Sequence, residues 1–210
     1  MKTPFLISGL VVLAASWCPT APGAETNLVG TVAPTPVLVT PGGDHQFLGR
    51  LYYRGDERPR RPRSAVVLNF MGLKCIPCRK ELPHFLRVVR KAAKQSAESG
   101  ARLRFFVVST DPLSAKADLR KFLEAKKMDF QTEVLLDPYR KAAAKFGVKA
   151  IPRTVVISPQ GRITADITGL GNDYADILRK GIETALKDVG RTGTRTKSEV
   201  KAHTSLPVEP

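Results

Sequence analysis

An apolar, β-branched run that leads directly into two closely spaced cysteines constrains this chain more than any other feature. The run 64–72, SAVVLNFMG, has the composition of a buried central strand. Cys75 and Cys78 follow it, separated by Ile76 and Pro77, and an amphipathic stretch begins at once. A proline fits the first turn of a helix, where its missing N–H would have no partner in any case. The sequence therefore predicts a buried strand, a short turn that carries two thiols, and a helix.

The rest of the chain continues to alternate between strand and helix patterns. After the cysteines, apolar residues recur at helical spacing with basic residues on the other side. Later, two β-prone runs flank the turn residues Pro159, Gln160 and Gly161, which is typical of a β-hairpin. This order predicts an α/β protein with a central mixed β-sheet flanked by helices. The predicted elements are strands at 64–72, 103–111 and 130–137, helices at 75–100, 113–128, 138–148 and 172–190, and a hairpin of 153–158 with 162–169.

The first 24 residues have the pattern of a secretory signal peptide. A positive start at Lys2 precedes a short apolar run and then small residues, and cleavage is expected after residue 23 or 24. A lipoprotein signal would instead make Cys18 the lipidated residue, but the bulky Trp17 before it fits that processing poorly. The pattern predicts an exported protein, periplasmic or otherwise extracytoplasmic, whose mature chain keeps only the close-spaced cysteine pair.

The length of 210 residues and the 42% hydrophobic content allow one sizeable core. We expect an extended Pro/Arg-rich lead-in at 25–63, in which 36–40 and 46–53 form a hairpin, and a domain at 64–190. A disordered basic tail is expected at 191–210, where apolar periodicity is absent. The chain therefore predicts one folded domain with additions at both ends.

The net charge of +15 and the isoelectric point near 10.1 are strongly basic. The basic residues are spread along the chain, with no interleaved aromatics and no nucleic-acid motif. We therefore interpret them as a solvated surface and expect no nucleic-acid partner. A weak association with anionic membrane surfaces stays open on the charge alone.

The cysteine pair has the features of a working redox pair. A bridge across so small a loop would add little stability, so chemistry explains the pair better than stapling does. At the start of a helix, unsatisfied backbone donors stabilise a thiolate, and Lys74 and Arg79 add positive charge. The sequence thus predicts Cys75 as the exposed, ionised nucleophile and Cys78 as the resolving thiol.

Metal binding is the first alternative for the two thiols. A structural zinc site needs four ligands, and the three histidines, His45, His84 and His203, lack finger-like spacing. A copper-binding chaperone would need a histidine brought to the pair, but His84 lies six residues past Cys78 and faces almost the opposite side of the helix. We expect no metal and no cofactor.

A family resemblance follows from these motifs. The strand, the Cys-Ile-Pro-Cys turn and the helix, with Pro83 inside that helix and AIPRTVVIS at 150–158, resemble the thioredoxin superfamily over 64–190. Within it, VVLNF and RKELP look most like the exported thiol-disulfide oxidoreductases of the TlpA/ResA kind. The resemblance implies a thioredoxin-like fold.

The resemblance also implies roles for individual residues. Cys75 would attack and Cys78 would resolve, and Pro152 would be a cis-proline beside the sulfurs. Glu81 would be the acid that tunes the thiols and accepts the proton of Cys78. Pro83 would be the kink of the active-site helix.

Three positions depart from the family pattern or flank the site. Lys74 stands where a tryptophan is usual, and Arg153 follows Pro152 where a small hydroxyl residue is common, adding a positive group near the sulfurs. Ile151 precedes that proline. We expect Lys74, Ile151 and Arg153 to contact substrate. Asn69 occupies the place of the buried carboxylate of cytosolic thioredoxins.

The predicted function is exchange of protein disulfides by a periplasmic oxidoreductase that acts as a reductant. Its partners would be proteins with disulfides or thiols and a membrane redox donor. A thiol peroxidase is the alternative enzyme, although that chemistry usually places a threonine three residues before the reactive cysteine, where this chain has Gly72. The copper-binding chaperone remains the non-enzymatic alternative.

Overall fold

The computed structural model describes residues 27–52 and 63–187 of the chain. The predicted signal peptide, Cys18, most of the arginine-rich loop at 53–63 and the predicted tail lie outside the described residues. Within them, no helix has both the length and the apolar character needed to cross a membrane.

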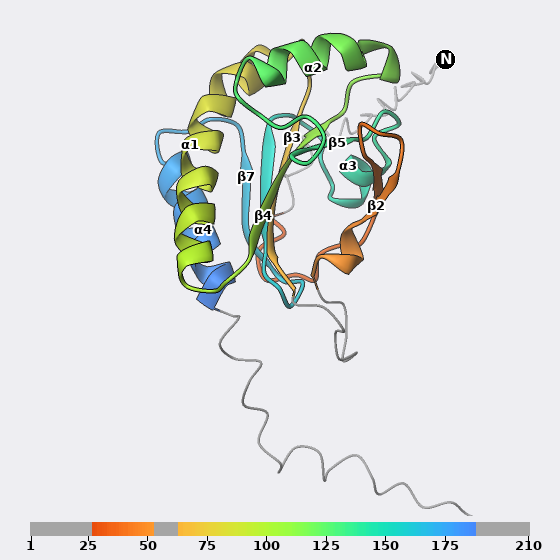
Figure 1. Cartoon of the computed structure of the whole chain (residues 1–210). Coiled ribbons are helices and arrows are strands. Elements are labelled where there is room, and N and C mark those ends of the chain that lie inside the picture. The colour runs from red at the N-terminus through yellow and green to blue at the C-terminus, as the bar shows by residue number, and fades with distance from the viewer. Residues whose placement is uncertain (1–26, 53–62, 188–210) are drawn as a thin grey trace, which may run out of the picture.

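A seven-stranded mixed sheet forms the centre of the molecule (Figure 1). Three neighbouring strands, β5, β4 and β3, are parallel, and the other pairings are antiparallel. Strand β3 is buried at every position, as its continuous apolar sequence predicts. The strand order is β2-β1-β5-β4-β3-β6-β7, with β1 Val37–Val39, β2 His45–Phe47, β3 Ala65–Met71, β4 Leu103–Ser109, β5 Val134–Leu136, β6 Arg153–Ile157 and β7 Ile163–Thr168.

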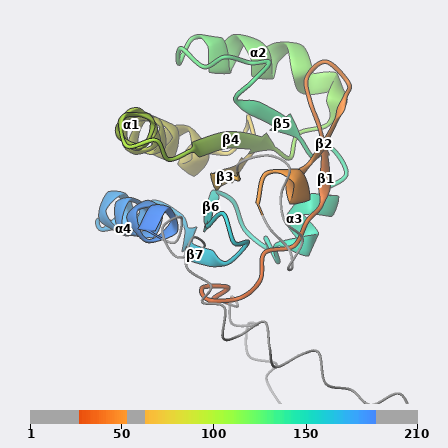
Figure 2. The same ribbon diagram turned by 60° about the horizontal axis from the view of Figure 1, so that its bottom comes forward.

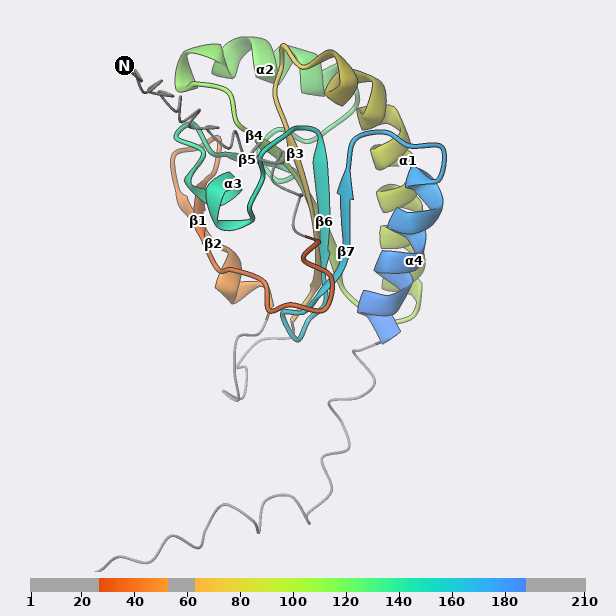
Figure 3. The same ribbon diagram turned by 180° about the vertical axis from the view of Figure 1, so that it is seen from behind.

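Helices cover both faces of the sheet (Figure 2). Two long helices, α1 and α4, lie side by side on one face with α2 beyond them, and α3 lies on the other face, near the β1–β2 hairpin that forms one edge of the sheet (Figures 2 and 3). Two hydrophobic cores result, one on each side of the sheet. The helices are α1 Ile76–Glu98, α2 Lys116–Glu124, α3 Lys141–Lys145 and α4 Tyr174–Lys187, with 3-10 turns at Leu48–Arg50 and Leu113–Ala115.

The lead-in is joined to the sheet. Its predicted hairpin is confirmed, and β1 adds to the sheet by pairing Val39 with Leu136 of β5. Upstream of the hairpin, Gly30 N–H donates to the Ile163 carbonyl at 2.8 Å, and Ala33 N–H donates to the Gly161 carbonyl at 2.7 Å. The folded domain therefore begins well before residue 64, where the sequence predicted its start, and the first regular strand is β1.

The remaining elements follow the sequence pattern, with shorter helices than predicted. The segment 113–128 opens as a 3-10 turn before α2, and 138–148 yields only the five residues of α3. Gly147, with φ of +61°, ends α3 in the left-handed conformation, as predicted for a helix-terminating glycine.

Candidate active site

The cysteine pair lies at the amino terminus of α1, just beyond the carboxyl end of β3. Cys75 is the N-cap residue and is disulfide-bonded to Cys78, with their Cα atoms 5.2 Å apart. Its Sγ accepts a hydrogen bond from the Cys78 N–H at 3.2 Å. Cys75 is partly exposed whereas Cys78 is only 1% exposed. The helix terminus therefore directs a backbone donor at the accessible sulfur, which favours its thiolate once the pair is reduced.

The turn before Cys75 is held by a carboxylate that follows the next strand, β4. Both Asp111 oxygens accept the Leu73 N–H, at 3.0 and 2.9 Å, and Ser109 Oγ donates to Asp111 at 2.7 Å. The Cys75 N–H also donates to the Gly72 carbonyl at 3.1 Å. Sequence reasoning did not select Asp111. Its place at the end of the second predicted strand was the available signal, since the carboxyl ends of parallel strands meet at one end of the sheet.

The Ile151–Pro152 segment lies against the accessible sulfur. The peptide bond is cis, as the family resemblance implied, and the Ile151 carbonyl oxygen is 3.7 Å from Cys75 Sγ. Ile151 is half-buried and packs against the core that contains Cys78, and Pro152 is buried. The structure thus brings together segments of α1 and β6 that are far apart in sequence.

Glu81 is buried one turn beyond Cys78. Its Oε1 accepts hydrogen bonds from Asn69 Nδ2 at 2.8 Å and from Thr154 Oγ1 at 3.3 Å. Its Oε2 is buried without a hydrogen-bond partner among the described residues. Burial raises the pKa of the Glu81 carboxyl, and the hydrogen bonds from neighbours such as Asn69 oppose part of that rise. Burial therefore favours the protonated form of this carboxyl relative to an exposed one.

Two further polar side chains complete this buried cluster. Thr154 Oγ1 lies 3.1 Å from the Tyr174 hydroxyl and also accepts a hydrogen bond from Asn69 at 2.8 Å. Burial, and then the negative charge of Glu81, raise the pKa of the Tyr174 hydroxyl, so it stays protonated. Thr154 was detectable in principle, because strand alternation places it on the same face as Pro152, which was expected beside the sulfurs. Tyr174 gave no comparable signal.

The structure corrects the expectation for Arg153. Its side chain is 2% exposed and forms a two-pronged ion pair with Asp166 of β7, at 2.7 and 2.6 Å. A third nitrogen donates to the Gly147 carbonyl at 3.2 Å, and Asp166 also accepts the Leu28 N–H at 2.9 Å. The expected contact with substrate is therefore wrong, because the guanidinium is enclosed on the other face of the sheet.

The other residues singled out near the cysteine pair, Lys74, Pro83 and His84, are exposed to solvent. Lys74 is exposed immediately before Cys75, and Pro83 lies within α1. His84 is exposed, with its Nδ1 3.4 Å from an Arg87 nitrogen. In the described ranges, no three His, Cys, Asp or Glu side chains are grouped as metal ligands.

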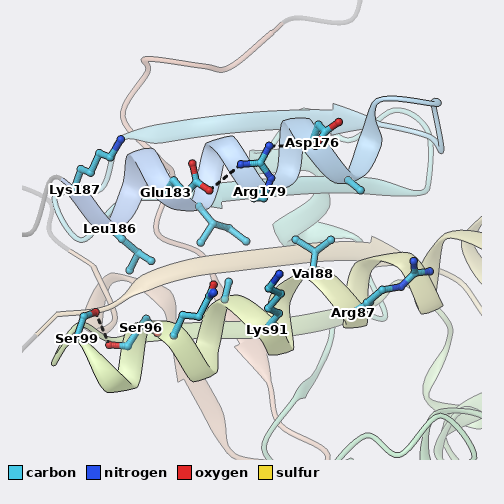
Figure 4. Close-up of a pocket in the computed structure, with 14 residues that line it drawn as sticks. Arg87, Val88, Lys91, Ser96, Ser99, Asp176, Arg179, Glu183, Leu186 and Lys187 are labelled. Carbon is cyan, nitrogen blue, oxygen red and sulfur yellow. Dashed lines mark hydrogen bonds and ion pairs between the residues drawn. The ribbon is translucent and has the colours of Figure 1, made fainter.

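A separate groove of about 580 Å³ runs between α1 and α4 (Figure 4). Its floor includes Val88 and Leu186, and the Arg179 side chain beside it is paired with Asp176 and Glu183. It begins at position 87, roughly 14 Å along the helix from Cys78 at 1.5 Å per residue. The groove is thus distinct from the disulfide site.

A thioredoxin-like sheet, a disulfide at a helix terminus and a cis-proline beside it define the class: a thioredoxin-like thiol-disulfide oxidoreductase. The chain belongs to the AhpC/TSA family, whose model matches residues 60–166.

Named relatives agree with this class. The chain is 26% identical over 164 residues to the thiol-disulfide oxidoreductase ResA of Bacillus subtilis, covering 76% of this chain and 80% of that protein. It is 28% identical over 142 residues to ResA of Geobacillus thermodenitrificans, covering 67% of this chain and 70% of that protein. The resemblance to proteins of the TlpA/ResA kind is confirmed.

Solved structures confirm the fold. A thiol:disulfide interchange protein from a Bacteroides species superposes with a TM-score of 0.54 at 20% identity, covering 83% of this chain and 97% of that one. The thioredoxin domain of a thiol-disulfide oxidoreductase from Bacteroides vulgatus gives 0.53 at 22% identity, covering 73% and 97%.

Proposed function

We propose that this chain reduces disulfides of other exported proteins through Cys75 and Cys78, with Glu81 as an internal proton acceptor. The observation that carries the proposal is the arrangement of the three groups on α1. One sulfur is accessible, the other is buried, and a buried carboxyl with an unpartnered oxygen lies one turn further on. Disulfide exchange requires this division of labour between an attacking thiol and a resolving thiol.

In the first step, the Cys75 thiolate attacks one sulfur of a substrate disulfide. The substrate S–S bond breaks, a mixed disulfide forms on Cys75, and the released substrate sulfur leaves as a thiolate that takes a proton from solvent. The Cys78 N–H, 3.2 Å from Cys75 Sγ, is placed to stabilise the attacking thiolate. Lys74 and Ile151 flank the reacting sulfur and would contact the substrate chain, next to Pro152.

In the second step, Cys78 resolves the mixed disulfide. Its thiol transfers a proton to Glu81 and its sulfur attacks Cys75, so the internal S–S bond forms and the second substrate sulfur leaves as a thiolate. Two electrons have passed from the cysteine pair to the substrate. A carboxyl whose pKa is raised by burial is a stronger base than an exposed one, and it is therefore better suited to take a proton from a thiol.

The proposed location is the periplasm or another extracytoplasmic space. The support is the signal-peptide pattern of the first 24 residues. In that setting a membrane redox donor would return the pair to its dithiol form, and the net charge of +15 would favour weak contact with anionic membrane surfaces.

Peroxide reduction is the competing activity, and position 72 bears on it. A Cβ on Gly72 would lie 3.2 Å from Ile151 Cδ1 and 3.6 Å from an Asp111 oxygen. A threonine there, as thiol peroxidases usually have, would require Ile151 to move. The chain lacks that threonine, and a side chain at position 72 would displace the residue that precedes the cis-proline.

An insulin reduction assay tests the proposal. The mature chain with a dithiol donor should reduce insulin disulfides, the Cys75→Ser variant should not, and peroxide consumption should stay at the background rate. Cys75-dependent peroxide consumption without insulin reduction would overturn the proposal in favour of the peroxidase.

A further inference from the structure

Several exposed apolar side chains lie at the end of the sheet that carries the disulfide, where the parallel strands have their carboxyl ends. Ile76, between the cysteines, is 66% exposed, and Leu113 and Leu170 are 52% and 41% exposed. Leu113 lies two residues past the Asp111 that holds the active-site turn. Leu170 follows Gly169, whose N–H donates to the Pro152 carbonyl at 2.9 Å. Three separate segments thus present apolar groups beside one reactive sulfur.

Two lysines frame the same sulfur from both of its flanking segments. Lys74 precedes Cys75, and Lys149 lies two residues before Ile151. Both are exposed, and within 27–52 and 63–187 neither is in an ion pair. We call Lys74, Ile76, Leu113, Lys149 and Leu170 the redox rim.

Acidic side chains at this end of the sheet offset part of those charges. Asp111 accepts hydrogen bonds from the Leu73 N–H and from Ser109, and Asp137 accepts the N–H groups of the first turn of α3, but neutral donors do not cancel the charge of a carboxylate. Glu81 is only 1% exposed. Asp173, three residues past Leu170, is the acidic side chain that remains exposed nearby. Arg79 and Lys80 near the start of α1 are exposed as well, so exposed basic side chains outnumber exposed acidic ones around the apolar rim.

We propose that the redox rim selects protein segments in which apolar and acidic residues flank the reacting cysteine. Burial of the apolar groups would favour binding, and opposite charges would accelerate encounter and disfavour basic segments. The inference rests on the proposed function and specifies its substrate class. Lys74 stands where the family usually has an aromatic residue. Substrate selection at this position would therefore depend on charge and not on contact with an aromatic ring.

Two model peptides test this selection. Both carry one cysteine, joined in a mixed disulfide to a chromophoric thiol, within the same apolar segment, and they differ only in having aspartates or lysines on either side. The release rate is measured with the reduced mature chain, and a small uncharged disulfide serves as the chemical reference. At low ionic strength the acidic peptide should react about tenfold faster than the basic one. The two rates should converge at high salt, where charges are screened within about 3 Å.

Charge reversal at the rim supplies the matched comparison. Lys149→Glu should lower or invert the ratio of acidic to basic rates, and Lys74→Glu should do the same. Lys94→Glu places an equal change on an exposed residue of α1 that is roughly 28 Å along the helix from Cys75, and should leave the ratio unchanged. Leu113→Ser should slow the apolar peptides more than serine-substituted versions of them.

The outcomes distinguish failure of the substrate selection by the redox rim from failure of the proposed disulfide reduction. If the uncharged disulfide is reduced but both peptides react equally, or if Lys94→Glu lowers the ratio as much as Lys149→Glu, the rim does not select by charge and the proposed function stands. If the reduced chain fails with the uncharged disulfide as well, the proposed function itself fails.

Discussion

Replacing Glu81 with glutamine tests the site most directly, because it removes a charge and a proton acceptor with little change in shape. The side chain is buried, its Oε2 has no partner among the described residues, and Asn69 and Thr154 hold its Oε1. Glutamine can keep an oxygen toward those donors but cannot accept a proton from Cys78. The variant should therefore keep the fold and lose the proton transfer.

The size of the expected shift follows from helix geometry. Cys78 and Glu81 are three residues apart on α1, so their Cβ atoms are about 5–6 Å apart. Two unit charges at about 6 Å and an effective dielectric constant of about 20 interact by about 3 kcal/mol. That energy corresponds to about two pKa units. Where Glu81 is ionised, its removal should lower the pKa of the Cys78 thiol by up to about two units, and that of the more distant Cys75 by about one.

Thiolate titration and resolution kinetics measure these effects together. The two thiols and the carboxyl titrate as a coupled set, so alkylation rates of the reduced protein should be followed across pH for both cysteines. Resolution of a mixed disulfide on Cys75 should slow by about 10² or more in Glu81→Gln. Glu98→Gln, an exposed change in the last turn of α1, is the control. If Glu81→Gln leaves both the titration and the resolution rate at the wild-type values, the proton-acceptor role is wrong.

Three further predictions concern accessibility, packing and pH. Alkylation of the reduced protein, followed by peptide mass spectrometry, should label Cys75 before Cys78; the reverse order would exchange their roles. Arg153→Met should lower the free energy of unfolding by about 3–5 kcal/mol by stranding a buried carboxylate, whereas Arg179→Met at an exposed ion pair should cost at most about 1 kcal/mol, both measured by urea denaturation; equal losses would contradict the buried pairing. Because folding raises the pKa of Glu81 above its usual 4.5, the folded state loses stability as pH rises through the raised pKa. Denaturation of Glu81→Gln from acidic to alkaline pH should lack that loss, and parallel curves for variant and wild type would refute it.

Local sequence patterns were sufficient for the centre of the fold and for the cysteine chemistry. A continuous apolar run specifies β3, and the cysteines, Pro77 and the amphipathic spacing specify the start of α1. Glu81 was readable as well, because it precedes Phe85 by four residues and so shares the buried face of that helix.

Contacts between segments that are distant along the chain could not be predicted from the sequence. Arg153 was expected near the sulfurs because its neighbour Pro152 is there, but its direction depends on the register that sets Asp166 of β7 within reach. Single-sequence reasoning does not provide that register. The same holds for β1, whose attachment to the sheet depends on one pairing, between Val39 and Leu136.

The two edge strands of the sheet, β2 and β7, determine how readily the protein can associate with itself through strand pairing. One outer strand, β2, has only three residues, and short edge strands offer few backbone groups to another chain. On the other side, the start of β7 is already paired, through Ile163, with the upstream segment at Gly30, and an inward-pointing charge, Asp166, lies in its middle. Inward charges and covered edges oppose strand-to-strand aggregation. The lead-in thus shields both margins of the sheet, and a shortened chain beginning at residue 64 should expose β5 and β7 and aggregate more readily than the full-length protein.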